Sequence, residues 1–337
     1  MPPVSNEPAA PPARRAVVDI GTNSVKLLVG DVIGDVVTPL LEQSRQTRLG
    51  RGLYTQHRLL PESVATTARA VAAFHVLARE CGAGAVRAIA TSAAREAINV
   101  ETLIEAVRVA AGLEVEIISG EQEARWGFAG VMSDPRLHDQ TVLLLDVGGG
   151  STEFVLGRGL EVRFRQSHRL GAVRLLEELA PADPPAATDL ARGRRAVALA
   201  LETALAPALR PALNAFGAEA VRLVGTGGTA TILAMMARGL QRFDRDAVDG
   251  HVLSRGDVAE RLAQLWSLPT AWRREIPGLP PERADVILTG VLIYDAVMAC
   301  FGFDALCVTT RSLRFAALVE WPPAGARLER GSRPAGG

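Results

Sequence analysis

Two segments of this chain carry, at the same spacing, residue types that bind phosphate and metal. Asp19-Ile20-Gly21-Thr22-Asn23-Ser24 follows an apolar run, and so does Asp146-Val147-Gly148-Gly149-Gly150-Ser151. Each places an Asp at the end of a strand, then Gly and Ser, then a second apolar run, which predicts a β-hairpin with exposed backbone N–H groups at its turn. Such turns bind anions, and the Asp can hold the metal that accompanies a phosphate. The repeat therefore predicts two hairpins that grip a phosphorylated ligand from both sides.

A third glycine-rich segment, Gly225-Thr226-Gly227-Gly228-Thr229, follows a predicted strand and precedes a predicted helix. A glycine turn at the start of a helix binds anions well, although it can also serve only close packing. The segment is not a Walker motif, because no Gly-Lys-Ser follows. We expect Gly227 and Gly228 to contact phosphate.

The remaining candidates are ambiguous from the residues alone. Arg95 lies where a predicted strand meets a helix, so it is either a phosphate clamp or a solvated surface residue. Glu121 and Glu123, in the first turn of their helix, are by themselves typical of surface carboxylates that the helix dipole favours. The segment His168-Arg169-Leu170-Gly171 is either a loop clamp or a turn, and the other histidines have no ligand or triad spacing.

Alternating strands and helices predict an α/β fold with a mainly parallel sheet in each half. Strands are expected at about 16–20, 25–32, 35–41, 85–90 and 113–118, with helices at about 61–81 and 99–111. The second half repeats the order, with strands at about 142–147, 154–158, 161–166 and 220–224. The segments 85–92 and 220–227 resemble each other as the two hairpins do. Two paired repeats predict duplicated βββαβα halves around a cleft that binds the ligand.

Length and composition predict two domains of similar size in the 337 residues. We expect a disordered tail over 1–13, domains over 14–135 and 136–321, whose last helix could pack back on the first domain, and a second disordered tail over 322–337. The net charge is zero, so general attraction to nucleic acid or membrane is not indicated. Three scattered cysteines and no evident membrane-spanning run predict a cytoplasmic protein.

Several motifs in this order give the chain a family resemblance. They are Asp19-x-Gly-x-Asn-Ser, Ala90-Thr-Ser-Ala-Ala-Arg-Glu-Ala97, Ile118-Ser-Gly-x-x-Glu123-Ala-Arg, Asp146-x-Gly-Gly-Gly-Ser-Thr-Glu153, Arg169-Leu-Gly, Gly225-Thr-Gly-Gly-Thr229, and Pro277-Gly-Leu with Arg283-Ala-Asp285. Together they resemble the exopolyphosphatase / guanosine pentaphosphate phosphohydrolase family of the actin–hexokinase-like superfamily. The resemblance covers about residues 15–320 and corresponds to a short form without the C-terminal helical domain of longer members.

The resemblance implies two actin-like (ribonuclease-H-like) domains and hydrolysis of phosphoric anhydrides. The reaction releases terminal phosphate from inorganic polyphosphate or the γ-phosphate from pppGpp in a cytoplasmic homodimer. By the resemblance Glu123 is the general base for water, which reverses the surface interpretation given above. Asp146 and Glu153 match metal-binding carboxylates for Mg²⁺ or Mn²⁺, and Asp19 is expected to join them. The positions that match phosphate contacts are Asn23, Ser24, Arg95, Gly148, Gly149, Gly150 and Ser151.

Two positions depart from the family pattern. Gln122 stands where the family usually has a first acidic residue, which is expected to change metal affinity. Arg314-Phe315-Ala316 stands where the family usually has Arg-Glu-Gly.

Two other function classes stay open. One is a sugar or acetate kinase with an adenosine site at Gly225–Thr229, and the other is a sensor that binds polyphosphate or ppGpp without turnover.

Overall fold

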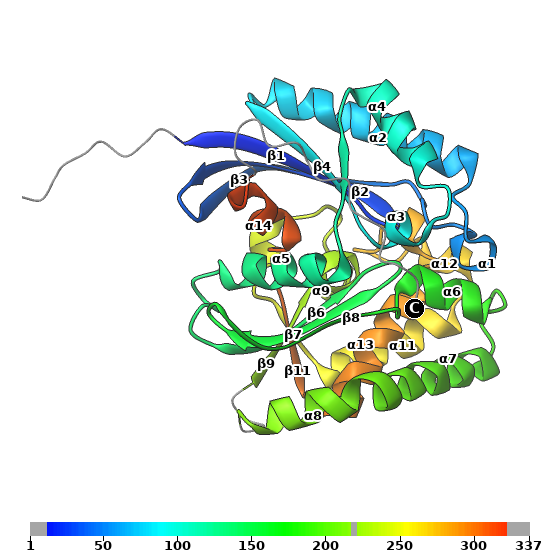
Figure 1. Cartoon of the computed structure of the whole chain (residues 1–337). Helices are drawn as coiled ribbons and strands as arrows, with labels where there is room; N and C mark the ends of the chain where they lie inside the picture. The colour runs from blue at the N-terminus through cyan, green and yellow to red at the C-terminus, as the bar shows by residue number, and fades with distance from the viewer. Residues whose placement is uncertain (1–11, 217–220, 322–337) are drawn as a thin grey trace, which may run out of the picture.

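The computed structural model describes residues 12–216 and 221–321. Two mixed sheets form the centre of the molecule, and helices lie between and outside them (Figure 1). The predicted tails lie outside the described residues, except that the first strand already begins at Ala13 and pairs it with Val32.

The first sheet has the strand order β3-β2-β1-β4-β5. Its strands are β1 (Ala13–Ile20), β2 (Ser24–Ile33), β3 (Val36–Gln46), β4 (Ala85–Ala90) and β5 (Val115–Ile117). Helices α2 (Pro61–Glu80) and α4 (Glu101–Ala111) cover one face, and α14 (Leu313–Val319) lies against the other (Figure 1). The short helices α1 (Leu53–Gln56) and α3 (Ser92–Glu96) lie at the end of the sheet near the site.

The second sheet has the order β10-β11-β9-β6-β7-β8. Its strands are β6 (Thr141–Val147), β7 (Thr152–Arg158), β8 (Glu161–His168), β9 (Val221–Thr226), β10 (Val252–Ser254) and β11 (Ala305–Val308). Its helices are α6 (Ala172–Leu179), α7 (Ala187–Ala200), α8 (Ala206–Asn214), α9 (Gly227–Arg238), α10 (Arg245–Val248), α11 (Arg255–Ser267), α12 (Thr270–Arg273) and α13 (Ile287–Phe301). A π-helical segment, Leu201–Leu205, joins α7 to α8, and a 3₁₀ turn spans Pro281–Arg283.

The predicted duplication is present in both sheets. In each, three antiparallel strands form a meander, β1-β2-β3 or β6-β7-β8, and the first strand then pairs in parallel with β4 or β9. Because β1 and β6 end at Ile20 and Val147, both hairpin turns lie at the carboxyl ends of parallel strand pairs. The α/β fold class and the repeated halves are therefore confirmed, but the expectation of mainly parallel sheets is wrong, because each meander adds two antiparallel strand pairs to its sheet.

Helix α5 (Gly120–Met132) lies between the two sheets (Figure 1). Ala124, Phe128 and Val131 pack with residues of β6 and β7, whereas Trp126 packs with α14 and the first sheet. The predicted boundary at 135 and 136 assigned this helix to the first domain, but its contacts reach both layers. The chain therefore enters the space between the two sheets twice, once at α5 and again at α14.

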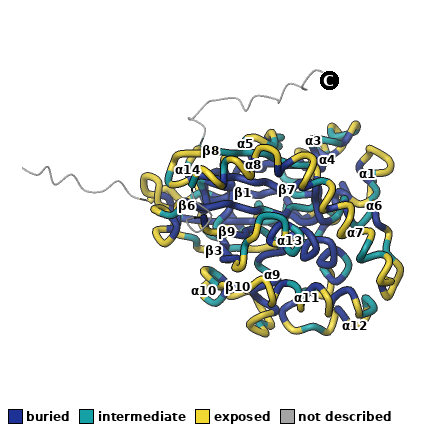
Figure 2. Tube along the Cα trace, turned by 90° about the horizontal axis from the view of Figure 1, so that it is seen from below, coloured by how far each residue is buried: buried dark blue, intermediate teal, exposed yellow. Residues whose placement is uncertain are grey.

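The buried residues concentrate along the strands and along α13, whose two sides are both covered (Figure 2). The helical run Ala187–Asn214 is long and apolar enough to meet a length and composition test for membrane spans, contrary to the expectation from sequence. Buried side chains such as Val197, Leu205 and Leu209 place one face of that run in the core of the second half. A single helix of this kind is weak support for a membrane span, since core helices meet the same test.

Candidate active site

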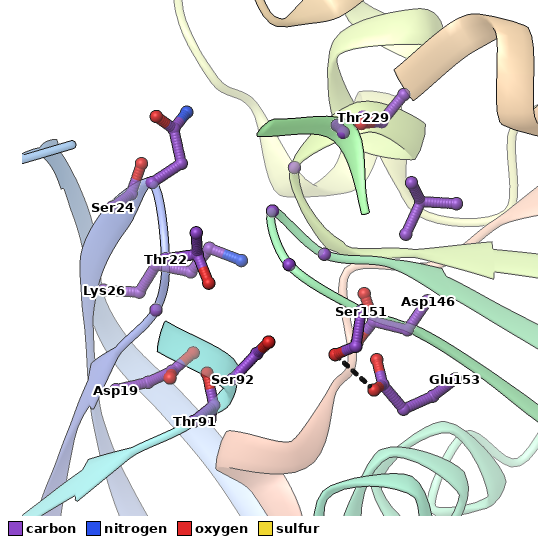
Figure 3. A pocket seen from close by; sticks show the side chains of 18 of the residues that line it. Asp19, Thr22, Ser24, Lys26, Thr91, Ser92, Asp146, Ser151, Glu153 and Thr229 are labelled. Atoms are coloured by element: carbon purple, nitrogen blue, oxygen red, sulfur yellow. Dashed lines mark hydrogen bonds between the residues drawn. The ribbon is translucent and has the colours of Figure 1, made fainter. Parts of the chain in front are cut away.

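The two predicted turns face each other across one cavity of about 80 Å³. Figure 3 shows Asp19, Thr22, Ser24 and Lys26 on the side of the first sheet, and Asp146, Ser151 and Glu153 on the side of the second. The predicted site residues that line the cavity are Asp19, Asn23, Ser24, Glu123, Asp146, Gly148, Gly149, Gly150, Ser151, Glu153 and Gly228. Segments more than a hundred residues apart therefore meet as the repeat predicted.

The turns present several donors to this cavity. The N–H groups of Gly21 and Gly148 donate to Ser24 O and Ser151 O at 3.0 and 2.9 Å, so these two groups close the turns. Among the described residues, the N–H groups of Gly149 and Gly150 have no hydrogen-bond partner. Asn23 Nδ2 is also buried without one. Unpaired buried donors favour an anionic ligand because it satisfies them.

The second turn is packed so closely that only glycine fits. A Cβ on Gly149 would lie 2.8 Å from Thr22 Cβ, and one on Gly150 would collide with the hydroxyls of Tyr54 and Ser92. The segment after His168 supports the same turn, since a Cβ on Gly171 would lie 2.5 Å from the carbonyl carbon of Gly149. Of its two sequence interpretations, the structure thus shows a supporting turn.

Four carboxylates line the cavity, from Asp19, Glu123, Asp146 and Glu153. Burial raises the pKa of all four above the ordinary values, and the negative charges of neighbouring carboxylates raise the pKa values of Glu123, Asp146 and Glu153 further. Lys26 lowers the pKa values of both Asp residues but does not offset burial. Crowded carboxylates of this kind are typical of functional sites.

Glu123 is paired with Arg95, whose Nη1 donates to Glu123 Oε2 at 2.6 Å. The Arg95 side chain also donates to Ile118 O and does not line the cavity. Burial raises the pKa of Glu123 to about 7, against the opposing effect of Arg95. Glu123 is only 8% exposed, so the surface interpretation of this residue is wrong. The phosphate contact of Arg95 stays a prediction.

Of the two glycines expected to contact phosphate, Gly228 lines the cavity and Gly227 does not. Gly227 has a φ of 84°, and a Cβ there would collide with Asp146 Oδ1. This glycine therefore allows the end of β9 to approach the Asp146 carboxylate. Gly228 lies on the wall between the first cavity and a larger one. A Cβ on Gly228 would lie 3.3 Å from Arg283 Nη1, so this glycine leaves room for the guanidinium.

Sequence reasoning did not assign Lys26, Thr22, Thr91, Ser92, Thr229 or Arg283 to the site, although all six line the cavity. Lys26 is the only lysine of the chain and follows the first turn by two residues, a signal that could have identified it. Burial lowers its pKa, while Asp19 opposes that shift. Arg283 Nη2 donates to Ser24 Oγ at 2.6 Å across the cavity, a contact that no local pattern predicts.

The carboxylates also fit a divalent cation. Asp19 Oδ1 is buried without a hydrogen-bond partner, and four acidic side chains share the cavity with the single lysine. Within the described ranges, no three His, Cys, Asp or Glu side chains converge as a preformed metal site. Mg²⁺ commonly binds one or two carboxylates together with substrate phosphates and water, which this donor set can provide.

A second cavity of about 770 Å³ adjoins the first and shares Lys26, Gly228 and Arg283 with it. Its lining combines apolar side chains, amides and charged groups. These include Ile232, Met235, Phe243, Ile276, Leu279, Gln43, Gln46, Gln241, Arg242, Arg274, Arg314, Glu42 and Glu282. A ligand held by its terminal phosphate in the first cavity can extend into this space.

The two departures from the family pattern lie outside the first cavity. Gln122 Oε1 accepts from Arg125 at 3.2 Å, while Gln122 Nε2 is buried without a hydrogen-bond partner from the described residues. Phe315 is 1% exposed and packs between the guanidinium groups of Arg245 and Arg311, each about 5 Å from the ring centre. Neither departure therefore lines the predicted phosphate site, and Phe315 is part of the core.

Comparison with known proteins agrees with this geometry. Residues 13–324 match the Ppx/GppA phosphatase family. The chain is 32% identical to exopolyphosphatase 2 of Mycobacterium tuberculosis over 84% of this chain and 89% of that protein. It is 28% identical to a guanosine-5'-triphosphate,3'-diphosphate pyrophosphatase of Vibrio atlanticus, covering 58% of that protein.

Solved structures give the same result. An exopolyphosphatase from Cytophaga hutchinsonii has a TM-score of 0.80 with 28% identity, covering 90% of this chain and 96% of that one. The Aquifex aeolicus Ppx/GppA phosphatase has a TM-score of 0.69 with 31% identity, covering 91% and 98% of the two chains. The family match over most of the chain shows that this chain belongs to the Ppx/GppA phosphatase family, and the facing turns and their shared cavity agree with it.

Proposed function

We propose that this protein releases terminal orthophosphate from inorganic polyphosphate by the attack of water. The observation that supports it most directly is the position of Glu123, a buried carboxylate with a pKa of about 7, in one cavity with two phosphate-binding turns. A base with a pKa near the working pH accepts a proton efficiently. Two of the similar proteins are named exopolyphosphatases, which agrees with the proposal.

The chemistry uses groups on both walls of the cavity. The oxygen of water forms a bond to the terminal phosphorus, the bond from that phosphorus to the bridging oxygen breaks, and Glu123 takes the proton of water. Lys26, Arg283 and the N–H groups of Gly149 and Gly150 neutralise the phosphoryl oxygens. A bound Mg²⁺ or Mn²⁺ would add positive charge at those oxygens, held by Asp146 and Glu153, with Asp19 nearby.

The proposed metal site gives a direct prediction. Asp146→Ala and Glu153→Ala should each raise the Mg²⁺ concentration needed for half-maximal activity, by about 10-fold or more, because each removes an oxygen ligand or a group that orients one. The measurement is phosphate release against Mg²⁺ concentration. Glu161→Ala, on the exposed part of β8, is the matched control and should leave the curve unchanged. Full wild-type activity in excess chelator would contradict the metal assignment.

A second candidate is the hydrolysis of pppGpp to ppGpp, and the second cavity favours it. Phe243 can stack on a base, and the amides of Gln43, Gln46 and Gln241 can bond to its edge. Gln43 and Gln46 lie on β3, whereas Gln241 and Phe243 lie between α9 and α10, so no single local motif of the sequence indicates a nucleoside site. The kinase alternative would also use this space, but it assigns no role to Glu123.

Parallel assays separate these functions. We expect polyphosphate to have a higher kcat/KM than pppGpp at equal Mg²⁺, and ATP to be a poor substrate, because the first cavity contacts phosphates alone. Phe243→Ala should then leave polyphosphate hydrolysis unchanged. A higher kcat/KM for pppGpp that Phe243→Ala lowers would replace the proposal by the second candidate. Binding without phosphate release from any of the three would favour the sensor. The homodimer and the cytoplasmic location stay predictions.

A further inference from the structure

Glu153 is held differently from the other carboxylates of the cavity. It is 2% exposed, yet among the described residues no Arg, Lys or His forms an ion pair with it. Its Oε1 instead accepts hydrogen bonds from two neutral hydroxyls, Ser151 Oγ at 2.8 Å and Ser167 Oγ at 2.8 Å. A buried carboxylate without a cationic partner depends on such hydrogen bonds for its orientation.

Ser167 does not line the cavity and belongs to none of the motifs described above. It lies on β8 directly opposite Glu153 in the register of β7 and β8. On its other side the start of α5 fixes its position, because a Cβ on Gly120 would lie 2.9 Å from both Ser167 Cβ and Ser167 Oγ. The hydroxyl therefore lies between the element that carries Glu123 and the one that carries Glu153.

We propose that Ser167 is a positioning residue that fixes which oxygen of Glu153 faces the cavity. With Oε1 occupied by two hydroxyls, Oε2 is left without a hydrogen-bond partner from the described residues and is the oxygen available to a cation or a water molecule. Ser151 alone would leave Glu153 free to rotate about its last bond, so that either oxygen could turn towards the cavity. The inference rests on the proposed role of Glu153 as a metal ligand.

The test is Mn²⁺ binding by the full-length protein in the presence of inorganic phosphate, followed by electron paramagnetic resonance. Ser167→Ala should weaken Mn²⁺ binding by about 10-fold, as the loss of a group that orients a ligand commonly does. Ser267→Ala removes a hydroxyl whose only hydrogen-bond partner among the described residues is Gln264 O, and it should change nothing. If Ser167→Ala does not fold, Ser167→Cys, of similar size and with a weaker donor, provides the measurement and should show a loss in the same direction.

A double-mutant cycle separates positioning from a general structural effect. In the Glu153→Gln background, Ser167→Ala should add less than about a twofold change, because its effect passes through Glu153. Equal losses in both backgrounds, unchanged binding by Ser167→Ala, or no Mn²⁺ binding by the wild type would each overturn the proposal. The readout does not use polyphosphate hydrolysis, so a protein without that activity would refute the proposed function and leave this result standing.

Discussion

Glu123→Gln is expected to lower phosphate release from polyphosphate by about 10² to 10⁴, the range typical for the loss of a general base. Gln has nearly the same shape but cannot accept the proton of the attacking water. Polyphosphate binding should persist, because the turns and Lys26 are unchanged. The measurement is the steady-state rate together with the dissociation constant for a short polyphosphate. Near-normal turnover by the variant would show that another group is the base.

The pH dependence provides a second readout of the same residue. Below a pKa of about 7 the Glu123 carboxyl is protonated and cannot act as a base, so kcat/KM of the wild type should rise with pH through that value and then level off. Glu121→Gln is the matched control, since Glu121 is in the same helical turn, is exposed and pairs with Arg165 outside the cavity. It should keep both the rate and the pH profile.

Gly130→Ala should destabilise the protein strongly. A Cβ at this position in α5 would collide with the carbonyl oxygen of Ser312 and lie 2.7 Å from its carbonyl carbon. Backbone atoms cannot move aside as a flexible side chain can. We therefore expect the free energy of unfolding to fall by about 1–3 kcal/mol or more, the typical cost of overpacking. Urea denaturation followed by circular dichroism measures this change.

Gly127→Ala is the matched control, since Gly127 is buried one turn earlier in the same helix. Its Cβ would lie 3.6 Å from Leu144 Cδ2, an ordinary van der Waals contact. Alanine favours helix over glycine by up to about 1 kcal/mol, so this variant should be as stable as the wild type or more so. Equal stability of the two variants would contradict the close contact between α5 and the segment before α14.

The elements were predictable because their signals are local. Strand β4 has the predicted bounds Ala85–Ala90, and helix α2 begins at Pro61 and ends one residue earlier than predicted. The hairpin turns were predictable for the same reason, since Asp, Gly and Ser at a strand end define the local backbone. Helix α5 begins at Gly120 because Ser119 Oγ accepts from Gln122 N at 3.0 Å, a capping contact within four residues.

What the sequence could not predict depends on contacts between distant segments. The local sequence around Glu123 indicates a surface carboxylate. The second sheet and α14, which cover its helix, come later in the chain, so local patterns do not reveal the burial. Arg283 reaches Ser24 across 259 residues, and Ser167 reaches Glu153 through a strand register that hydrophobic patterning does not determine. Local rules therefore identified the turns, while the proposed base Glu123, the cation Arg283 and the proposed positioning residue Ser167 needed the tertiary structure or the family resemblance.

The packing of α14 on the first sheet has a consequence for protein synthesis. Val17, Leu28 and Ile89 belong to strands made early, but Phe315, Ala317 and Leu318, which share a buried cluster with them, are made near the end of the described chain. Until those residues leave the ribosome, the part of this sheet face that α14 covers remains exposed and available to chaperones or to other nascent chains. A chain that stops before Leu313 would carry both hairpin turns of the cavity and still expose that apolar surface, so it should be recognised by quality control as incomplete.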